Sequence, residues 1–309
     1  DTSLIFTFFE AITEELYFLC ILSIAREQFL FIIKSHDKFK LGKKIIKKYR
    51  YNFLSIKNDI TKKNEVKILS KFKANLLVVD KYKFYDSSTY NIVKKKIKKL
   101  ILIDAYKKSY KNIKYLNPTF NKGPGSKSPV LIIPSLLLKN FPKKKTNKNI
   151  KKIFIFFGNY DFNNLHIKII KILNKIGNFN IYVHINNKSK LRKIKKKIYF
   201  YDEKNFFNSL KKSDLAITSG GLIMYDVMNL NTPLILLPQI KHQMINSRYY
   251  EQNKCLISIL NNSELKKNFI SKFKIINDRK SRYSMIKRQQ KVFSNKERRK
   301  IFNILKKCI

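Results

Sequence analysis

The sequence is poor in the residues that build zinc sites, disulfide frameworks and membrane spans. It contains no tryptophan and only three cysteines, Cys20, Cys255 and Cys308, which form neither a Cys-x-x-Cys pair nor a Cys/His cluster. This pattern indicates neither a metal site nor a disulfide framework, and it favours a reducing, cytoplasmic compartment. No stretch reaches the roughly 18 uninterrupted apolar residues that a membrane-spanning helix needs. No basic region precedes the apolar segment 16–25, as a signal peptide would require.

Acidic residues are also scarce, because 20 Asp and Glu stand against 67 Lys and Arg, a formal net charge of +47. A polyanionic partner such as nucleic acid, an anionic membrane surface or an acidic glycan is one interpretation. We favour compositional drift, because Lys exceeds Arg and the basic residues are scattered without an aromatic stacking platform. We therefore expect no specific nucleic-acid partner, and leave open a peripheral contact with anionic surfaces.

Glycine is unusually rare for an α/β protein, with 7 residues, yet the chain has the composition of a folded protein. Hydrophobic residues make up 44% of it, including 24 Phe, which excludes wholesale disorder. A length of 309 residues suits two domains. We predict them at residues 1–140 and 141–309, joined by the Lys- and Asn-rich segment 139–151.

Strand and helix patterns alternate along the whole chain, which is typical of a doubly wound parallel sheet. In the first half we predict strands at 4–9, 29–33, 75–79 and 100–103, and helices at 16–26, 43–49 and 87–99. In the second half we predict strands at 152–157, 180–184, 198–201, 215–218 and 234–237, and helices at 163–176, 205–211, 222–230 and 284–305. A further helix is expected to end the segment 214–252.

The turn Ser219-Gly220-Gly221 lies between a predicted buried strand and a predicted helix. Its backbone N–H groups and the positive end of the helix dipole suit a diphosphate, and the missing Cβ atoms allow a ligand to approach the backbone. Asp226, one turn into the helix, can reach a ribose hydroxyl. The three residues alone are equally compatible with a tight turn that binds nothing.

A wider pattern surrounds that turn. It comprises Tyr225-Asp226, Pro233, Pro238 and Gln243-Met-Ile-Asn246-Ser247, with Phe157-Gly158-Asn159-Tyr160-Asp161 after the earlier strand. In order and spacing it resembles the C-terminal domain of sugar-nucleotide enzymes of the GT-B architecture, glycosyltransferase family 28 among them. It is most similar to the UDP-sugar hydrolases of pseudaminic acid synthesis and their spore-coat-polysaccharide relatives, although Asp226 stands where those enzymes usually have Glu.

The resemblance implies two Rossmann-like doubly wound domains that face each other across a cleft. It also implies a UDP-sugar substrate and neither a cofactor nor a metal. The residues that it assigns to the nucleotide sugar are Gly158, Asn159, Ser219, Gly220, Gly221, Asp226, Gln243 and Asn246.

The N-terminal half of the chain matches the same hydrolase family more weakly. Val79-Asp80-Lys81-Tyr82 resembles a strand end of the same hydrolases, which makes Tyr82 a candidate catalytic residue. The loop that holds the family's proposed catalytic histidine has Leu16 at that place in this sequence. We hypothesise that Glu15, or its neighbour Glu14, replaces the base, although an acidic first helical turn also serves as a cap.

None of the four histidines (His36, His166, His184 and His242) lies in that loop. We expect each to be a surface residue or a supporting one, with His242 able to touch a ligand.

Three kinds of function follow from these patterns. The first is an enzyme that acts on a UDP-sugar: we expect a hydrolase that releases UDP from a diacetamido-trideoxy-sugar nucleotide for surface-glycan synthesis, with a glycosyltransferase of the same architecture as the alternative. The second is a catalytically degenerate homologue that only binds a nucleotide sugar. The third, which we favour least, is a basic nucleic-acid-binding protein.

Overall fold

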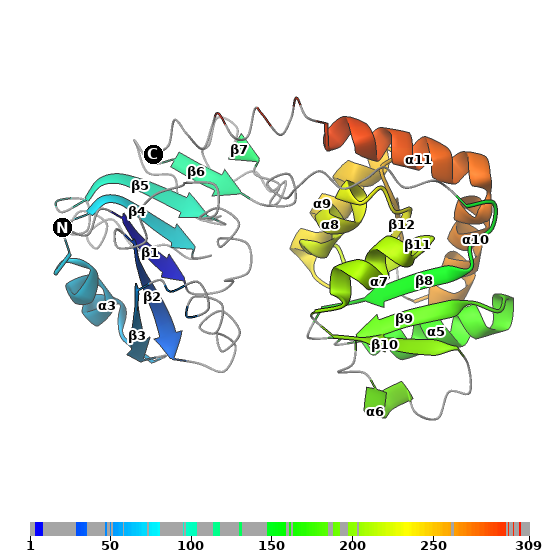
Figure 1. Cartoon of the computed structure of the whole chain (residues 1–309), viewed down its shortest axis with the longest axis horizontal. Helices are drawn as coiled ribbons and strands as arrows, with labels where there is room; N and C mark the ends of the chain where they lie inside the picture. Colours follow the sequence, from blue (N-terminus) through cyan, green and yellow to red (C-terminus); the bar gives the residue numbers. More distant parts are fainter. Residues whose placement is uncertain are drawn as a thin grey trace. The chain divides into compact units, whose positions relative to one another are not determined.

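The chain divides into two compact units (Figure 1): unit 1 comprises residues 1–138 and 300–309, and unit 2 comprises residues 139–299. The division predicted from the sequence differs by assigning residues 300–309 to the second domain, and its boundaries remain a prediction. The computed structural model describes residues 4–8, 29–35, 47, 50, 52–57, 59–72, 74–80, 95, 97–103, 114–117, 130–131, 147–158, 161, 163–184, 188–191, 197–202, 204–260, 263–294, 296, 299 and 303.

Unit 1 contains a seven-stranded parallel sheet in the order β3-β2-β1-β4-β5-β6-β7. Six of these strands follow the Rossmann order, and β7 extends the sheet at one edge. The elements are β1 (Leu4–Phe8), β2 (Phe29–Ser35), β3 (Asn52–Lys57), α3 (Lys62–Leu69), β4 (Ala74–Asp80), β5 (Ile97–Ile103), β6 (Lys114–Asn117) and β7 (Val130–Leu131). The predicted α/β class is therefore confirmed for this half of the chain.

The four strands predicted in the first half fall on β1, β2, β4 and β5, but one predicted helix is wrong at its end. Residues 97–99, placed at the end of a helix over 87–99, belong to β5, which pairs with β4 from Ala74 to Asp80. No Gly or Pro separates helix from strand in this lysine-rich stretch, so periodicity could not locate the junction. The predicted helix at 16–26 and most of that at 43–49 lie outside the described residues.

Unit 2 contains a six-stranded parallel sheet in the order β10-β9-β8-β11-β12-β13, again the Rossmann order. Its strands are β8 (Lys152–Phe156), β9 (Asn180–His184), β10 (Ile198–Tyr201), β11 (Leu215–Thr218), β12 (Leu234–Leu236) and β13 (Ile257–Ser258). Its helices are α5 (Leu165–Ile176), α6 (Lys188–Leu191), α7 (Phe206–Lys212), α8 (Ile223–Asn229), α9 (Lys241–Gln252), α10 (Leu265–Asn277) and α11 (Arg279–Val292). The sequence predicted most of these elements. It missed α6, β13 and α10, began the last helix five residues late and continued it past Val292, where α11 ends.

The core of unit 2 explains why its strands are continuous apolar runs. Ile153 and Ile155 of β8 lie in one buried cluster with side chains of α5 and α10. Phe154, on the opposite face, stacks on Tyr201 with ring centroids 4.9 Å apart and meets Phe206 of α7 edge-on. Helices thus cover both faces of the sheet, so the inner strands are mostly apolar on both faces, as Ile153, Phe154 and Ile155 of β8 show.

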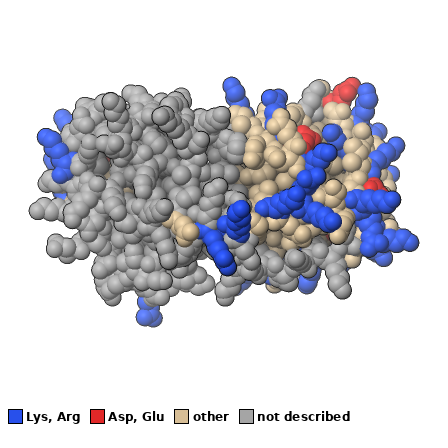
Figure 2. Space-filling model, turned by 90° about the horizontal axis from the view of Figure 1, so that it is seen from above, with Lys and Arg blue, Asp and Glu red and all other residues tan. Residues whose placement is uncertain are grey.

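Basic side chains are spread over the described surface. On the face shown in Figure 2, many Lys and Arg side chains and few Asp and Glu side chains are visible among the described residues. Contact with an anionic surface remains a prediction. Every helix that the structure describes is too short or too polar to span a membrane.

Candidate functional site

The strand order of unit 2 places two loops side by side. β8 and β11 are adjacent, with Phe156 paired to Thr218 at their carboxyl ends. The order reverses between these two strands, and doubly wound sheets bind their ligands at such a point. Gly158 follows β8 and the Ser219-Gly220-Gly221 turn follows β11. The fold therefore brings together the two segments that the resemblance assigned to one nucleotide-sugar site.

Gly158 adopts a backbone conformation that side chains disfavour. Its φ is +80°, and a Cβ atom built on it would meet nothing within 4 Å. Another residue here would cost about 1–2 kcal/mol in backbone strain. The neighbouring Asn159 lies outside the described residues.

Gly220 is required for a different reason from the one that the sequence suggested. A Cβ atom there would lie 2.8 Å from both the Gln243 carbonyl oxygen and Ser247 Oγ, so α9 fills the space on that side of the turn. The missing side chain thus allows a helix, rather than a ligand, to approach. At Gly221 the corresponding Cβ would meet Gln243 Nε2 at 3.7 Å, an ordinary contact distance. Ligand binding by this turn remains a prediction, and Gly221 is the better position at which to test it.

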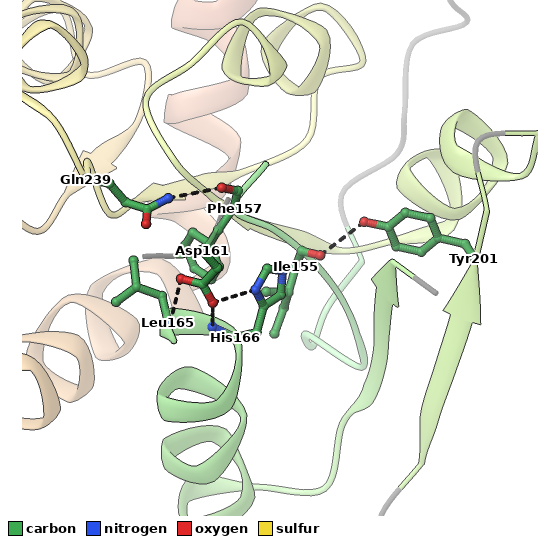
Figure 3. A network of polar contacts seen from close by, with 7 residues as sticks. All are labelled: Ile155, Phe157, Asp161, Leu165, His166, Tyr201 and Gln239. Carbon is green, nitrogen blue, oxygen red and sulfur yellow. Dashed lines mark hydrogen bonds and ion pairs between the residues drawn. The ribbon is translucent and has the colours of Figure 1, made fainter. Parts of the chain in front are cut away.

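Asp161 closes the N-terminal end of α5, as Figure 3 shows. One carboxylate oxygen accepts a hydrogen bond from Leu165 N–H at 2.8 Å, and the other accepts from His166 N–H at 2.9 Å and from His166 Nδ1 at 2.7 Å. Burial raises the pKa of Asp161, but the hydrogen bonds from the His166 side chain and the two backbone N–H groups outweigh it, so the pKa lies below its usual value. The carboxyl group is therefore ionised at neutral pH.

Gln239 is the residue of this region that the sequence analysis missed. Its Nε2 donates a hydrogen bond to the carbonyl oxygen of Phe157 at 3.0 Å (Figure 3), and its backbone N–H donates to Gln243 Oε1 at 2.8 Å. Gln239 follows β12, and β11 lies between β12 and β8 in the sheet, so this hydrogen bond joins loops from two strands that are not neighbours. It thereby ties the loop after β12 to the loop after β8. A polar residue directly after the strand-ending Pro238 was the available signal.

Replacing Gln239 by methionine, which keeps the length but removes the amide, should destabilise unit 2 by about 1 kcal/mol through loss of the bond to Phe157. The measurement is urea unfolding followed by circular dichroism. The matched control is Gln252→Met on the exposed end of α9, which should change the free energy by less than about 0.5 kcal/mol. Equal values for the two variants would mean that the Gln239 bridge contributes nothing.

The remaining predicted site residues of unit 2 lie around the Ser219 turn. Asp226 is half-buried in α8, and Ser219 is buried. Gln243, on α9, is half-buried with its Oε1 bonded to Gln239, while Asn246 is only 1% exposed. Contact between these side chains and a nucleotide sugar stays a prediction.

Other candidates lie outside the described residues or differ from expectation. Both predicted catalytic residues, Tyr82 and Glu15, lie outside the described residues. His166 and His184 are buried, so neither is on the surface. Because β9, α5 and their neighbours enclose these rings in aromatic contacts, both histidines belong to the core. Among the residues that the structure describes, no group of three or more His, Cys, Asp or Glu side chains could hold a metal ion.

No protein-family model matches the sequence. The sequence is 33% identical, over 113 residues, to an uncharacterized protein of Methanocaldococcus jannaschii. The match covers 33% of this chain and 23% of that protein. The match therefore spans about a quarter of the relative's length.

Several solved structures share the fold of nearly the whole chain, although their sequences are only distantly similar. MurG of Acinetobacter baumannii has a TM-score of 0.70 at 11% identity, covering 99% of this chain and all of that one. The spinosyn rhamnosyltransferase SpnG, complexed with thymidine diphosphate, has a TM-score of 0.61 at 10% identity, covering 93% and 96% of the two chains. A putative UDP-N-acetylglucosamine 2-epimerase from Listeria monocytogenes has a TM-score of 0.59 at 12% identity, covering 93% and 91%. These likenesses, together with the two Rossmann-ordered sheets, show the GT-B-type α/β fold that the sequence predicted.

Proposed function

We propose that this protein binds a nucleoside diphosphate sugar, most simply a UDP-sugar, in unit 2 and transfers the sugar to an acceptor. The observation that carries the proposal is the meeting of the Gly158 loop and the Ser219-Gly220-Gly221 turn at the point where the strand order reverses. Structures of similar fold include one that is complexed with thymidine diphosphate and one named for UDP-N-acetylglucosamine. They support a nucleotide-sugar ligand.

In the proposed complex the diphosphate lies against the backbone N–H groups of the Ser219–Gly221 turn. Gln243 Nε2 lies beside Gly221 and would donate to the same ligand, while Asp226 would accept a hydrogen bond from a ribose hydroxyl. An acceptor oxygen attacks the anomeric carbon as the bond from that carbon to the phosphate oxygen breaks. The electron pair leaves with UDP, and the acceptor proton passes to a base. Hydrogen-bond donors positioned at the departing diphosphate stabilise its charge.

Sugar transfer is preferred to the hydrolysis that the sequence pattern suggested, because proteins of similar fold include the spinosyn rhamnosyltransferase SpnG and SsfS6, a glycosyltransferase of Streptomyces sp. SF2575. The candidate base remains Glu15, or its neighbour Glu14, and Tyr82 remains a candidate catalytic residue. The two reactions differ in product: hydrolysis gives the free sugar, and transfer gives a glycosylated acceptor. Mass spectrometry of a reaction with a UDP-amino sugar and candidate acceptors distinguishes them.

The binding step is tested by isothermal titration of UDP into the purified chain and into Gly221→Val. We expect saturable binding by the wild type and at least about a tenfold higher Kd for the variant, about 1.4 kcal/mol. A Cβ at Gly221 is accommodated, and similar thermal unfolding midpoints of the two proteins are the check that the two valine methyl groups are accommodated as well. The control is Lys267→Ala, an exposed substitution on α10 that should leave the Kd unchanged. Absence of binding by the wild type, or an unchanged Kd in Gly221→Val, would contradict the proposal.

A further inference from the structure

The N-terminus of α5 is the place where a Rossmann-ordered sheet ordinarily receives phosphate. In dinucleotide-binding folds the pyrophosphate lies at the helix that follows the first strand, where backbone N–H groups have no intrahelical partner. In unit 2 the strand at that place in the order is β8 and the helix is α5. The first question is therefore whether the N–H groups at the start of α5 are available.

Three of them are occupied by a residue of the chain itself. The N–H groups of Asn164, Leu165 and His166 all donate to Asp161, the first to its carbonyl oxygen at 3.2 Å and the other two to its carboxylate. His166 Nδ1 adds a further hydrogen bond to the same carboxylate. Asn164 adopts φ 51° and its side chain makes no capping bond, so the side-chain cap that the structure describes comes from Asp161.

The negative charge of Asp161 also opposes the binding of phosphate at the N-terminus of α5. The Asp161 carboxylate is a negative group at the positive end of a twelve-residue helix, which is the position that a phosphate oxygen would take. A phosphate could bind there only by displacing the carboxylate from its hydrogen bonds and by lying close to its negative charge. Both requirements oppose binding of a second anion.

We propose that Asp161 is a specificity-determining residue that closes the α5 N-terminus to phosphate and so confines the ligand's diphosphate to the Ser219–Gly221 turn. The claim that the diphosphate lies on the Ser219–Gly221 turn rests on the proposed function. The arrangement favours a nucleoside diphosphate sugar over a dinucleotide held in the usual Rossmann manner. Asp161 thus acts by excluding an anion from one loop, and not by touching the reacting atoms.

Amide hydrogen exchange of the wild-type chain, read by mass spectrometry with and without saturating UDP, tests where the diphosphate lies. We expect slower exchange in peptides that cover 219–226 and no change in peptides that cover 163–170. Slower exchange over 163–170 would overturn the proposal, because it would place the ligand on the α5 N-terminus. This comparison needs no variant and does not depend on how well a variant folds.

A second experiment uses inorganic phosphate as the probe and compares the wild type with Asp161→Ala and Asp161→Glu. Removing the carboxylate should open the α5 N-terminus, so phosphate should slow exchange over 163–170 in Asp161→Ala and bind at least about tenfold more tightly than to the wild type. Asp161→Glu keeps the negative charge and should show no such gain. A purely structural cap would lower stability without creating phosphate affinity.

The two experiments separate the possible failures. If UDP protects no part of the chain, the proposed function fails, whereas the phosphate comparison still decides the role of Asp161. If Asp161→Ala is folded and binds phosphate no better than the wild type, the exclusion by Asp161 is wrong, whatever UDP does. If Asp161→Ala does not fold, the wild-type exchange pattern decides alone.

Discussion

Replacing Arg282 by methionine is expected to lower the free energy of unfolding of unit 2 by about 3–5 kcal/mol, the cost of breaking a buried ionic arrangement. The side chain is 1% exposed, and its guanidinium donates four hydrogen bonds to backbone carbonyl oxygens. Those of Ile276 and Asn277 lie at 2.9 and 2.6 Å, and those of Asn147 and Lys148 at 2.9 and 2.8 Å. Methionine fills a similar volume but leaves these acceptors without donors.

Arg282 matters because it joins segments that are distant in sequence. It lies in α11, while Asn147 and Lys148 are 135 and 134 residues earlier, just before β8. Asp214 holds the same segment from the other side, accepting hydrogen bonds from Lys151 N–H at 2.9 Å and Lys152 N–H at 2.8 Å. The methionine variant would also remove the favourable electrostatic interaction between Arg282 and Asp214, which adds to the loss.

The measurement for Arg282 is urea unfolding followed by far-ultraviolet circular dichroism, since the chain has no tryptophan. Arg282→Lys should give an intermediate loss, because one ammonium group cannot reach both pairs of carbonyls. Arg288→Met, an exposed change on the same helix, is the control and should cost less than about 0.5 kcal/mol. A loss in Arg282→Met no larger than in this control would refute the anchoring role.

Gly220→Ala is expected to destabilise unit 2 by about 1–3 kcal/mol, as overpacking of a filled site does. The added Cβ would lie 2.8 Å from the Gln243 carbonyl oxygen, a backbone atom of α9, and equally close to Ser247 Oγ. Ser247 Oγ already donates to that carbonyl at 2.7 Å, so the hydroxyl cannot move without breaking its bond. The helix itself would have to shift.

The adjacent glycine provides the control for this prediction. Gly221→Ala places its Cβ no closer than 3.7 Å to any atom and should leave the unfolding midpoint within about 1 °C, since a small surface change is worth little. Thermal unfolding of the two variants measures the difference. If both glycines tolerate alanine equally, the close packing of α9 on the turn is not what requires Gly220. Any loss of UDP binding in a Gly220 variant would reflect the displaced helix as well as the turn.

The strands were the most predictable part of the fold, and their chemistry explains it. Residues 180–184, 198–201 and 215–218 were predicted with the bounds that β9, β10 and β11 have. A strand that packs against helices is rich in apolar and aromatic residues, so it appears as a short apolar run between polar residues. β13, with two residues, is too short to leave such a signal.

The sequence by itself determined the α/β class, most strands of both sheets and the Ser219–Gly221 turn, because hydrophobic runs and glycine turns act locally. Only the tertiary structure decided the roles of particular residues at that turn. Gly220 is required by a helix more than twenty residues later in the chain, Gln239 bonds to Phe157 across the end of another strand, and Arg282 anchors residues before β8. Asp161 bonds to Leu165, only four residues later, so this contact is local. Its proposed role depends on the sheet order, which places β8 and α5 where a Rossmann fold ordinarily binds phosphate. Such contacts depend on which strands become neighbours, and hydrophobic periodicity carries no information about that choice.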